Sequence, residues 1–463
     1  MVEINNVKTT NKSPVFTAGL FLYISILQKA KLMIQRIFLL TLLLLFCLQI
    51  SYAQSFKINS DRLHASLMQL STFGKNEKGG TDRIAYSDYD LQAREYVISL
   101  MKDAGLSVSV DFAGNIIGRK KGTDDTLKPI AFGSHIDEVP NGGDYDGPVG
   151  SMSSIEVIKT LAENNFTTKH PLEVIIFTNE EGGVVGSRAL VGQLSKEALQ
   201  VVSNAGITQY EGIKKLGGNP DRINEIKRNP GDLAAFLELH IEQGANLYNE
   251  KIDIGVVEGI VAIDWWDITF TGFANHAGTT PMNLRKDPML AAAKFILAVN
   301  QTVKSYEGRQ VATVGKIQAF PGAGNVIPGE VKLNLEMRDL SSEKIWTIYK
   351  DLEKQAKRIA EEFDVEFNSK HIEVASKPAL ADPEVRRVIQ TQAEKLGLST
   401  LSLPSGAGHD AQEMARIAPM GMIFIPSKDG ISHAPSEFSS KEDIANGANV
   451  LLYTILELDK KLQ

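Results

Sequence analysis

The stretch Pro129-Ile-Ala-Phe-Gly-Ser-His-Ile-Asp137 decides the fold class of this 463-residue chain. It opens with a short apolar run of the kind found in buried strands, and residues 172–178 form a second such run. Between the two runs, residues 149–164 carry apolar side chains at helical spacing. Strand, helix and strand in this order predict an α/β domain with a mixed, largely parallel central sheet.

Polar residues follow both predicted strands directly. His135 ends the first run, and Glu180 and Glu181 come after the second. Ligands of such sheets collect at the carboxyl ends of the strands, so we expect these side chains to meet. Asp137 is two residues from His135, which suits a carboxylate that fixes the imidazole tautomer. Neighbouring side chains diverge, so one glutamate can bind metal while the other activates water. The alternative is a pair of solvated loop carboxylates.

Three more segments carry metal-ligand residue types. Asp146 lies in a Gly-Gly-Asp-Tyr-Asp-Gly loop, His240 lies in an alternating strand, and His433 lies in Gly430-Ile-Ser-His-Ala-Pro435. Three imidazoles and two carboxylates suit two divalent cations if one carboxylate bridges them. A donor set without thiolate suits Zn, Mn, Co or Ni alike, with Zn expected. Taken singly, each residue has a plainer interpretation, such as Asp146 capping the next helix or His240 being an ordinary core residue.

The pattern of elements changes near residue 257. Strand-like and helical segments then alternate as βαββαβ, at residues 260–271, 288–303, 311–319, 331–339, 342–363 and 365–372. This order predicts a ferredoxin-like lid or dimerisation domain, residues 257–373, inserted into the catalytic domain. The catalytic domain would then consist of residues 54–256 and 374–463.

Residues 1–53 have the features of a leader. An apolar run at residues 37–50 follows Lys29, Lys31 and Arg36 and precedes Ser51-Tyr-Ala53. This pattern predicts a signal peptide cleaved after Ala53, with Met33 as the natural start, and a secreted or periplasmic protein. An uncleaved anchor is the alternative, although the run is shorter than the ~20 apolar residues of a spanning helix.

Composition excludes several classes of function. The only cysteine, Cys47, lies in the leader, so the mature chain would have neither thiol catalysis nor disulfides. The net charge is −7 and the basic residues form no cluster, which argues against nucleic acid and against a stable membrane association.

Several longer motifs resemble a known family, the M20 metallohydrolases. The resemblance runs from about residue 60 to the C-terminus and is closest to the hydantoinase/carbamoylase-type amidases, which include N-carbamoyl-L-amino acid hydrolase, allantoate amidohydrolase and β-ureidopropionase. A histidine at position 240, where the peptidase branch has a carboxylate, points to the amidases. The motifs are Gly133-Ser-His-Ile-Asp137, Glu238-Leu-His-Ile-Glu-Gln-Gly244, Thr271-Gly-Phe-Ala-Asn-His-Ala-Gly-Thr-Thr-Pro-Met282, Asn325-Val-Ile-Pro-Gly329 and Ser405-Gly-Ala-Gly-His-Asp410.

The resemblance implies a role for each candidate residue. One metal would be held by His135, Asp146 and His240, and the other by Asp146, Glu181 and His433. Glu180 would be the general base, and His276 would reach the partner subunit's site in a homodimer to stabilise an oxyanion. The substrate would be held by Gln243, Asn325, Arg338, Ser405, Gly406 and His409, with Asn325 and Arg338 on its carboxylate.

The implied reaction is metal-dependent hydrolysis of a linear amide or ureido C–N bond in a small carboxylate-bearing molecule. The alternatives are a secreted M20-type exopeptidase or aminoacylase, and a catalytically inactive binding protein. Arg338 has its own alternative, a surface ion pair with a neighbouring acid. The chain also departs from the family at Glu138, where Thr is common, and in the longer segment Glu181-Gly-Gly-Val-Val-Gly-Ser-Arg188. Both departures leave the substrate open.

Overall fold

The computed structural model describes residues 19, 23, 25–39, 41, 56–372 and 376–462. The chain separates into two compact units, Met1–Phe56 and Lys57–Gln463. The predicted cleavage after Ala53 lies outside the described residues. Among the helices that are described, none has the length and apolar character needed to cross a bilayer.

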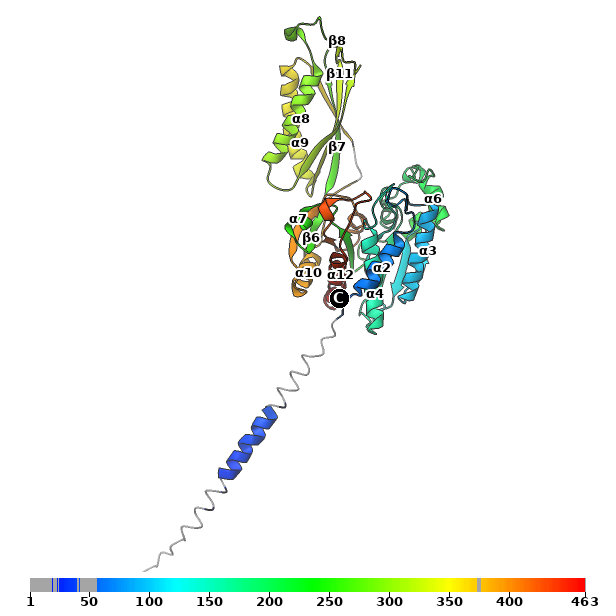
Figure 1. Ribbon diagram of the computed structural model, residues 1–463, viewed down its shortest axis with the longest axis vertical. Helices are drawn as coiled ribbons and strands as arrows, with labels where there is room; N and C mark the ends of the chain where they lie inside the picture. The colour runs from blue at the N-terminus through cyan, green and yellow to red at the C-terminus, as the bar shows by residue number, and fades with distance from the viewer. Residues whose placement is uncertain are drawn as a thin grey trace, which may run out of the picture. The chain divides into compact units, whose positions relative to one another are not determined.

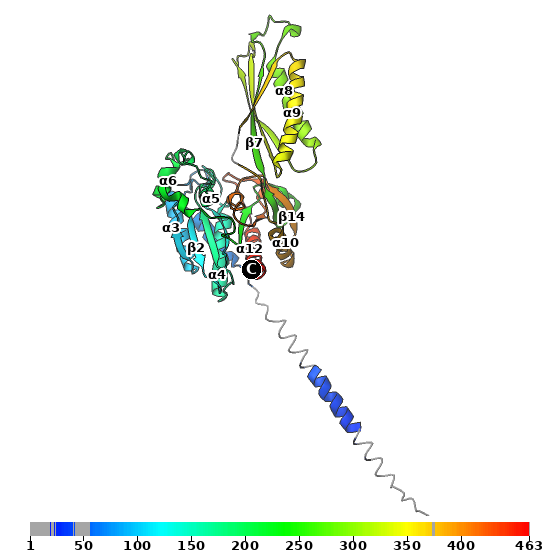
Figure 2. The same cartoon turned by 180° about the vertical axis from the view of Figure 1, so that it is seen from behind.

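The second unit is built on a nine-stranded sheet (Figures 1 and 2). Its strand order is β1-β2-β4-β3-β5-β15-β6-β13, with β14 beside β6. The central strands β4, β3, β5 and β15 run parallel, whereas the outer pairs, β1 with β2 and β6 with β13, are antiparallel. The expected mixed, largely parallel sheet is therefore confirmed. The strands are β1 (Ser107–Val110), β2 (Ile116–Lys120), β3 (Ile130–His135), β4 (Leu172–Phe177), β5 (Ala235–Ile241), β6 (Ile254–Ile260), β13 (Ala379–Leu380), β14 (Thr400–Ser405) and β15 (Met420–Ile425).

Helices cover both faces of this sheet. Consecutive residues of β5 contact helices on opposite faces of the sheet. Glu238 accepts a hydrogen bond from the backbone of α11, and Gly150 of α4 lies against the main chain of Leu239. With α4 lie α2 and α12, and α10 packs against α12 and β15. Fully covered strands explain why β3, β4, β5 and β15 consist almost wholly of buried residues. The helices are α2 (Ser60–Leu70), α3 (Asp88–Asp103), α4 (Pro148–Glu163), α5 (Val185–Leu190), α6 (Gln209–Lys215), α7 (Asn246–Glu250), α10 (Pro383–Lys395), α11 (Asp410–Met414) and α12 (Lys441–Lys461).

The second sheet belongs to the segment that the sequence analysis assigns to the lid. Its four strands are antiparallel in the order β12-β7-β11-β9, and α8 and α9 bury one face through Trp266, Phe270 and Ile348. The elements are β7 (Ala262–Thr271), α8 (Pro288–Ser305), β9 (Val311–Phe320), β11 (Glu330–Asp339), α9 (Ser342–Glu362) and β12 (Glu366–Ile372). Their order is the predicted βαββαβ. We call these elements the lid.

A small two-stranded ribbon extends the lid beyond the prediction. Strands β8 (Asn275–His276) and β10 (Val326–Ile327) pair only with each other, at the end of the lid farthest from the nine-stranded sheet (Figure 1). Two residues per strand leave no alternating pattern, so the ribbon could not be read from the sequence.

A buried ion pair holds the segment that follows β3. Arg83 and Glu138 are both fully buried, with Nη2 of Arg83 3.1 Å from Oε1 of Glu138. The same guanidinium donates to the carbonyl oxygens of Leu70 at 2.9 Å and Ile136 at 2.5 Å. Arg83 thus joins the end of α2 to the segment that follows β3. Glu138 is the partner of Arg83 in this contact, and it is one of the residues that depart from the family pattern.

We expect Arg83→Leu to lower the free energy of unfolding by about 3–5 kcal/mol, because it leaves the Glu138 carboxylate buried without its cation. Urea denaturation followed by circular dichroism measures the change. The double variant Arg83→Leu/Glu138→Leu should recover part of the loss. Equal losses in the single and double variants would contradict the pairing.

Candidate metal centre

Segments far apart in the sequence converge at the carboxyl ends of the parallel strands. His135 is the last residue of β3, and Glu180 and Glu181 follow β4. His240 lies on β5 opposite Phe424 of β15, and the loop after β15 carries His433. This is the edge of a parallel sheet at which ligands are expected.

Asp146 lies between these histidines. Its Oδ1 is 3.1 Å from Nε2 of His240 and 3.8 Å from Nε2 of His135. Its Oδ2 is 3.4 Å from Nε2 of His433, and that nitrogen is also 3.4 Å from Oε1 of Glu181. The five residues form two overlapping groups of potential ligands, His135–Asp146–His240 and Asp146–Glu181–His433. One carboxylate therefore belongs to both groups, as the bridging arrangement requires.

Hydrogen bonds at Nδ1 orient the buried histidines His135 and His240 so that Nε2 faces the site. Nδ1 of His135 lies 3.0 Å from the main-chain oxygen of Asp137, and Nδ1 of His240 lies 2.9 Å from that of Ile241. A carbonyl can only accept a hydrogen bond, so each Nδ1 carries the proton and each Nε2 is free to bind a cation. Both Nε2 atoms, and Oε1 of Glu181, are buried without a hydrogen-bond partner among the described residues. Unpaired buried donor atoms facing one another fit a site for divalent cations.

Asp137 differs from its expected role. Its main-chain oxygen, and not its carboxylate, makes the hydrogen bond to Nδ1 of His135, since the carboxylate oxygen is 3.9 Å away. The carboxylate instead accepts from the backbone N–H groups of Glu180 and Glu181, both at 3.2 Å. Asp137 therefore positions both glutamates and orients His135 only through its backbone.

The adjacent glutamates diverge as expected. Glu181 turns to His433, whereas Oε2 of Glu180 is 3.8 Å from Nε2 of His135. Burial, with further repulsion from Glu181 and Asp410, raises the pKa of Glu180 well above its ordinary value. A carboxylate with a raised pKa can both accept a proton and return it near neutral pH, which is what a general base and acid must do.

The charged groups around the site shift one another's pKa values, and Asp146 raises the pKa values of His240 and His433 to about 9. Burial raises the pKa of Glu181 to about 8, with Asp146 adding to the shift, and burial raises that of Asp137 to about 6. Burial also lowers the pKa of His135 to about 4, which keeps this ligand neutral. A buried excess of carboxylates is stabilised by positive charge. Imidazole and carboxylate donors without thiolate suit Zn, Mn, Co or Ni.

A third group of potential ligands, Glu238, His240 and His409, has other partners. Glu238 accepts from Oγ of Ser134 at 2.7 Å and from the backbone N–H of Ala411 at 2.9 Å. Each carboxylate oxygen of Glu238 thus accepts one hydrogen bond, and Glu238 links β5 to α11.

The residues expected to bind substrate fall into two places. Beside the metal ligands, Nε2 of Gln243 donates to Oδ2 of Asp146 at 2.5 Å, and His409 lies 2.8 Å from Oγ of Ser405. Arg338 lies at the base of the lid, where it donates to the carbonyl oxygen of Gly406 at 2.6 Å and to Glu336 at 2.7 Å. The ion pair with a neighbouring acid is thus present, and the same guanidinium also reaches the 405–408 loop.

His276 and Asn325 lie at the end of the lid that is far from Arg338 and from the nine-stranded sheet (Figure 1). His276 lies on β8, and the carbonyl oxygen of Asn325 accepts from the backbone N–H of Ala277 at 3.0 Å. Strand β11 separates this ribbon from Arg338 by eight residues, roughly 27 Å at about 3.4 Å per residue. Nδ1 of His276 accepts from the backbone of Gly278 and Thr279, so its exposed Nε2 carries the proton and can donate. Within one chain, these residues do not meet Arg338.

Glu437 is a functional residue that the sequence analysis did not identify. One carboxylate oxygen accepts from the backbone N–H groups of Tyr145 at 2.8 Å and Asp146 at 3.0 Å. The other accepts from Oγ of Ser432 at 2.9 Å and from the backbone N–H of His433 at 3.2 Å. Glu437 therefore ties the bridging ligand to the His433 loop. The signal that could have found it is its place four residues after His433.

The chain is similar to known hydrolases over most of its length. The model of the peptidase family M20/M25/M40 matches residues 131–457. An N-carbamoyl-L-amino acid amidohydrolase of Geobacillus stearothermophilus is 41% identical over 406 residues, which cover 87% of this chain and 99% of that protein. A ureidoglycolate hydrolase of Arabidopsis thaliana is 39% identical, with 88% of each chain covered. A crystal structure of a hydantoinase/carbamoylase family amidase from Burkholderia multivorans superimposes with a TM-score of 0.81 at 35% identity, covering 87% of this chain and 98% of that one.

We expect Glu437→Gln to weaken binding of the second divalent ion at least tenfold, because an amide nitrogen cannot accept the backbone N–H groups that the carboxylate holds. Titration calorimetry with Zn²⁺ measures both affinities. Glu442→Gln, an exposed change on α12, is the matched control. Unaltered affinities in Glu437→Gln would show that Glu437 does not position the ligands.

Proposed function

The chain belongs to the peptidase family M20/M25/M40, and from that membership and its relatives we infer that it is a metal-dependent amidohydrolase of C–N bonds other than peptide bonds. We propose that it cleaves a linear amide or ureido bond in a small carboxylate-bearing molecule of the N-carbamoyl-L-amino acid or allantoate type. Relatives named for N-carbamoyl-L-amino acids, ureidoglycolate and allantoate support this substrate class.

The observation that carries the proposal is the position of Asp146 between two groups of ligands, with Glu180 beside them. We propose that one cation is held by His135, Asp146 and His240, and the other by Asp146, Glu181 and His433. Two divalent cations supply Lewis acidity, which polarises a carbonyl and makes water more acidic. A ureido carbonyl is a poor electrophile, so this assistance matches the substrate.

The chain's own residues then move the proton. Glu180 takes a proton from the attacking water as the water oxygen bonds to the ureido carbon. When the C–N bond breaks, Glu180 returns that proton to the leaving nitrogen, which carries the carboxylate-bearing part of the substrate. Asp137 keeps Glu180 in place through the backbone of residue 180.

Substrate recognition requires the lid. We propose that Arg338 pairs with the substrate carboxylate, since a guanidinium matches a carboxylate in a bidentate manner, and that Gln243, Ser405, Gly406 and His409 line the same place. The hydrogen bond from Arg338 to the carbonyl oxygen of Gly406 already joins the lid to that loop.

His276 and Asn325 would act on the site of a second copy. They lie roughly 27 Å from Arg338 along a rigid strand at about 3.4 Å per residue, which is longer than any small ureido acid. If both ends of the lid serve catalysis, they therefore serve different active sites. We propose a homodimer in which the exposed Nε2–H of His276 stabilises the oxyanion in the partner subunit.

The proposal also covers the identity of the bound ion and the cellular location of the protein. Zn is the expected ion, with Mn, Co or Ni as alternatives. The basic and apolar pattern before Ser51-Tyr-Ala53 supports a secreted or periplasmic enzyme.

The metal-loaded enzyme should hydrolyse at least one of an N-carbamoyl-L-amino acid, allantoate and ureidoglycolate, and should not hydrolyse a dipeptide. Glu180→Gln should lower kcat by about 10²–10⁴-fold because it removes the group that carries the proton. Ammonia release and chromatography of the products measure the rates, and metal analysis should show unchanged metal content. Turnover of dipeptides alone, or full activity in Glu180→Gln, would refute the proposal.

Mixing two inactive variants tests the exchange of His276. His276→Ala and Glu180→Gln homodimers are each expected to be nearly inactive. A mixed dimer has one complete site, formed by Glu180 of one chain and His276 of the other, so activity should return after subunit exchange. If His276 acted within its own chain, both sites of the mixed dimer would be defective and no activity would return.

A further inference from the structure

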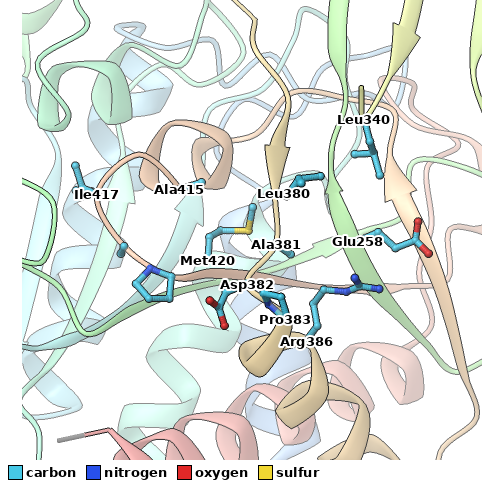
Figure 3. Close-up of a pocket in the computed structure, with 12 residues that line it drawn as sticks. Glu258, Leu340, Leu380, Ala381, Asp382, Pro383, Arg386, Ala415, Ile417 and Met420 are labelled. Carbon is cyan, nitrogen blue, oxygen red and sulfur yellow. The ribbon is translucent and has the colours of Figure 1, made fainter. Parts of the chain in front are cut away.

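A cavity of 710 Å³ lies where the lid joins the nine-stranded sheet (Figure 3). Glu258 of β6 and Leu380 of β13 line it, and these strands carry the chain into and out of the lid. Leu340, which follows β11, lines it from the lid side, and Arg386 of α10 and Met420 of β15 line it from the other. The cavity is therefore in contact with both chain crossings.

This cavity is separate from the metal centre. Met420 is the first residue of β15, whereas His240 pairs with Phe424, four residues further along that strand. At about 3.3 Å per residue, this places the metal ligands roughly 13 Å beyond Met420. Of the ligands, the base and the substrate residues assigned above, none is among the residues that line the cavity.

Its charged groups have opposite signs and one is unpaired. Nε of Arg386 is buried and has no hydrogen-bond partner among the described residues. In the view of Figure 3, the guanidinium of Arg386 and the carboxylate of Glu258 lie on the same side of the cavity. The neighbouring acid, Asp382, is committed to the start of α10, where it accepts from the backbone N–H of Glu384 at 2.9 Å. Apart from this helix-capping carboxylate, the charged side chains that line the cavity are Arg386 and Glu258.

The remaining wall is apolar. Met420, Leu340 and Leu380 are among the lining residues, and Leu380 is 66% exposed although it is a large aliphatic residue. A dianion would be repelled by Glu258, and a plain amine would be repelled by Arg386. A molecule with a carboxylate, an ammonium group and an apolar part matches all three features at once.

We propose that this cavity binds a free α-amino acid with an apolar side chain. The carboxylate pairs with Arg386, the ammonium group pairs with Glu258, and the side chain covers Leu340, Leu380 and Met420. The availability of this ligand rests on the proposed function, because hydrolysis of an N-carbamoyl amino acid releases an amino acid.

The test uses metal-loaded enzyme with ¹³C-methyl methionine and L-leucine as the probe. The Met420 methyl signal is assigned by its loss in Met420→Leu. We expect L-leucine to shift this signal saturably in the wild type and in Arg387→Gln, a change at the exposed neighbour that pairs with Glu384. In Arg386→Gln, and with 4-methylpentanoate or 3-methylbutylamine in place of leucine, half-saturation should require at least tenfold more ligand.

Two results would overturn the site: no shift of Met420 with L-leucine at tens of millimolar, or an equal titration in wild type and Arg386→Gln. This readout does not depend on turnover, so it is distinct from the test of the proposed function. An enzyme that hydrolyses ureido acids but shows no Met420 shift has the proposed function without the cavity site. A Met420 shift in a protein without ureido hydrolysis supports the cavity site alone.

Discussion

The carboxylate of Asp146 faces histidines on both sides, and the surrounding structure keeps it there. Glu437 holds the backbone N–H of Asp146 at 3.0 Å. The next residue, Gly147, has φ +80°, and a Cβ at that position would overlap the imidazole of His135. Glycine is therefore required for a steric as well as a conformational reason. The loop can bring the Asp146 carboxylate this close to His135, His240 and His433 only because Gly147 has no side chain.

Burial makes this arrangement costly without cations and stable with them. The carboxylates around Asp146 are almost fully buried, and burial raises the pKa values of Glu180, Glu181 and Asp137. These carboxylates repel one another in the folded protein, as expected at a site that binds cations and transfers a proton. Two buried guanidinium groups lie near Asp137, and both have other partners: Arg83 pairs with Glu138, and Arg94 donates to the carbonyl oxygen of Gly114. Stability and chemistry at this edge of the sheet are therefore coupled through the same charges.

The sequence predicted the elements that have a strong hydrophobic period, and it predicted that His135, Glu180 and Glu181, which come at or after the ends of β3 and β4, would lie close together. Residues 172–178 became β4, and the βαββαβ order of the lid matches the structure because each of those elements is long. Glu437 escaped prediction because it accepts from the backbone N–H groups of Tyr145 and Asp146, which are far away in the sequence. The contact of Asp137 with His135 escaped because it uses a main-chain oxygen, which the residue type does not reveal. The ribbon of β8 and β10 escaped because two residues carry no period. Capping by Asp146 proved wrong, since Gly147 precedes α4 and no side chain caps that helix.

The length of the lid separates Arg338, which we propose to bind the substrate carboxylate, from His276, which we propose to stabilise the oxyanion. Arg338 and His276 lie near opposite ends of stiff antiparallel strands, so no bending of the lid brings both to one small substrate. Under the proposed roles, Arg338 acts in the active site of its own chain, and His276 acts in the active site of a second copy. In the proposed homodimer, the base of one lid would contribute Arg338 to its own active site, and the far end of the same lid would contribute His276 to the partner's site. The cavity at that base is therefore well placed for a ligand that acts on both.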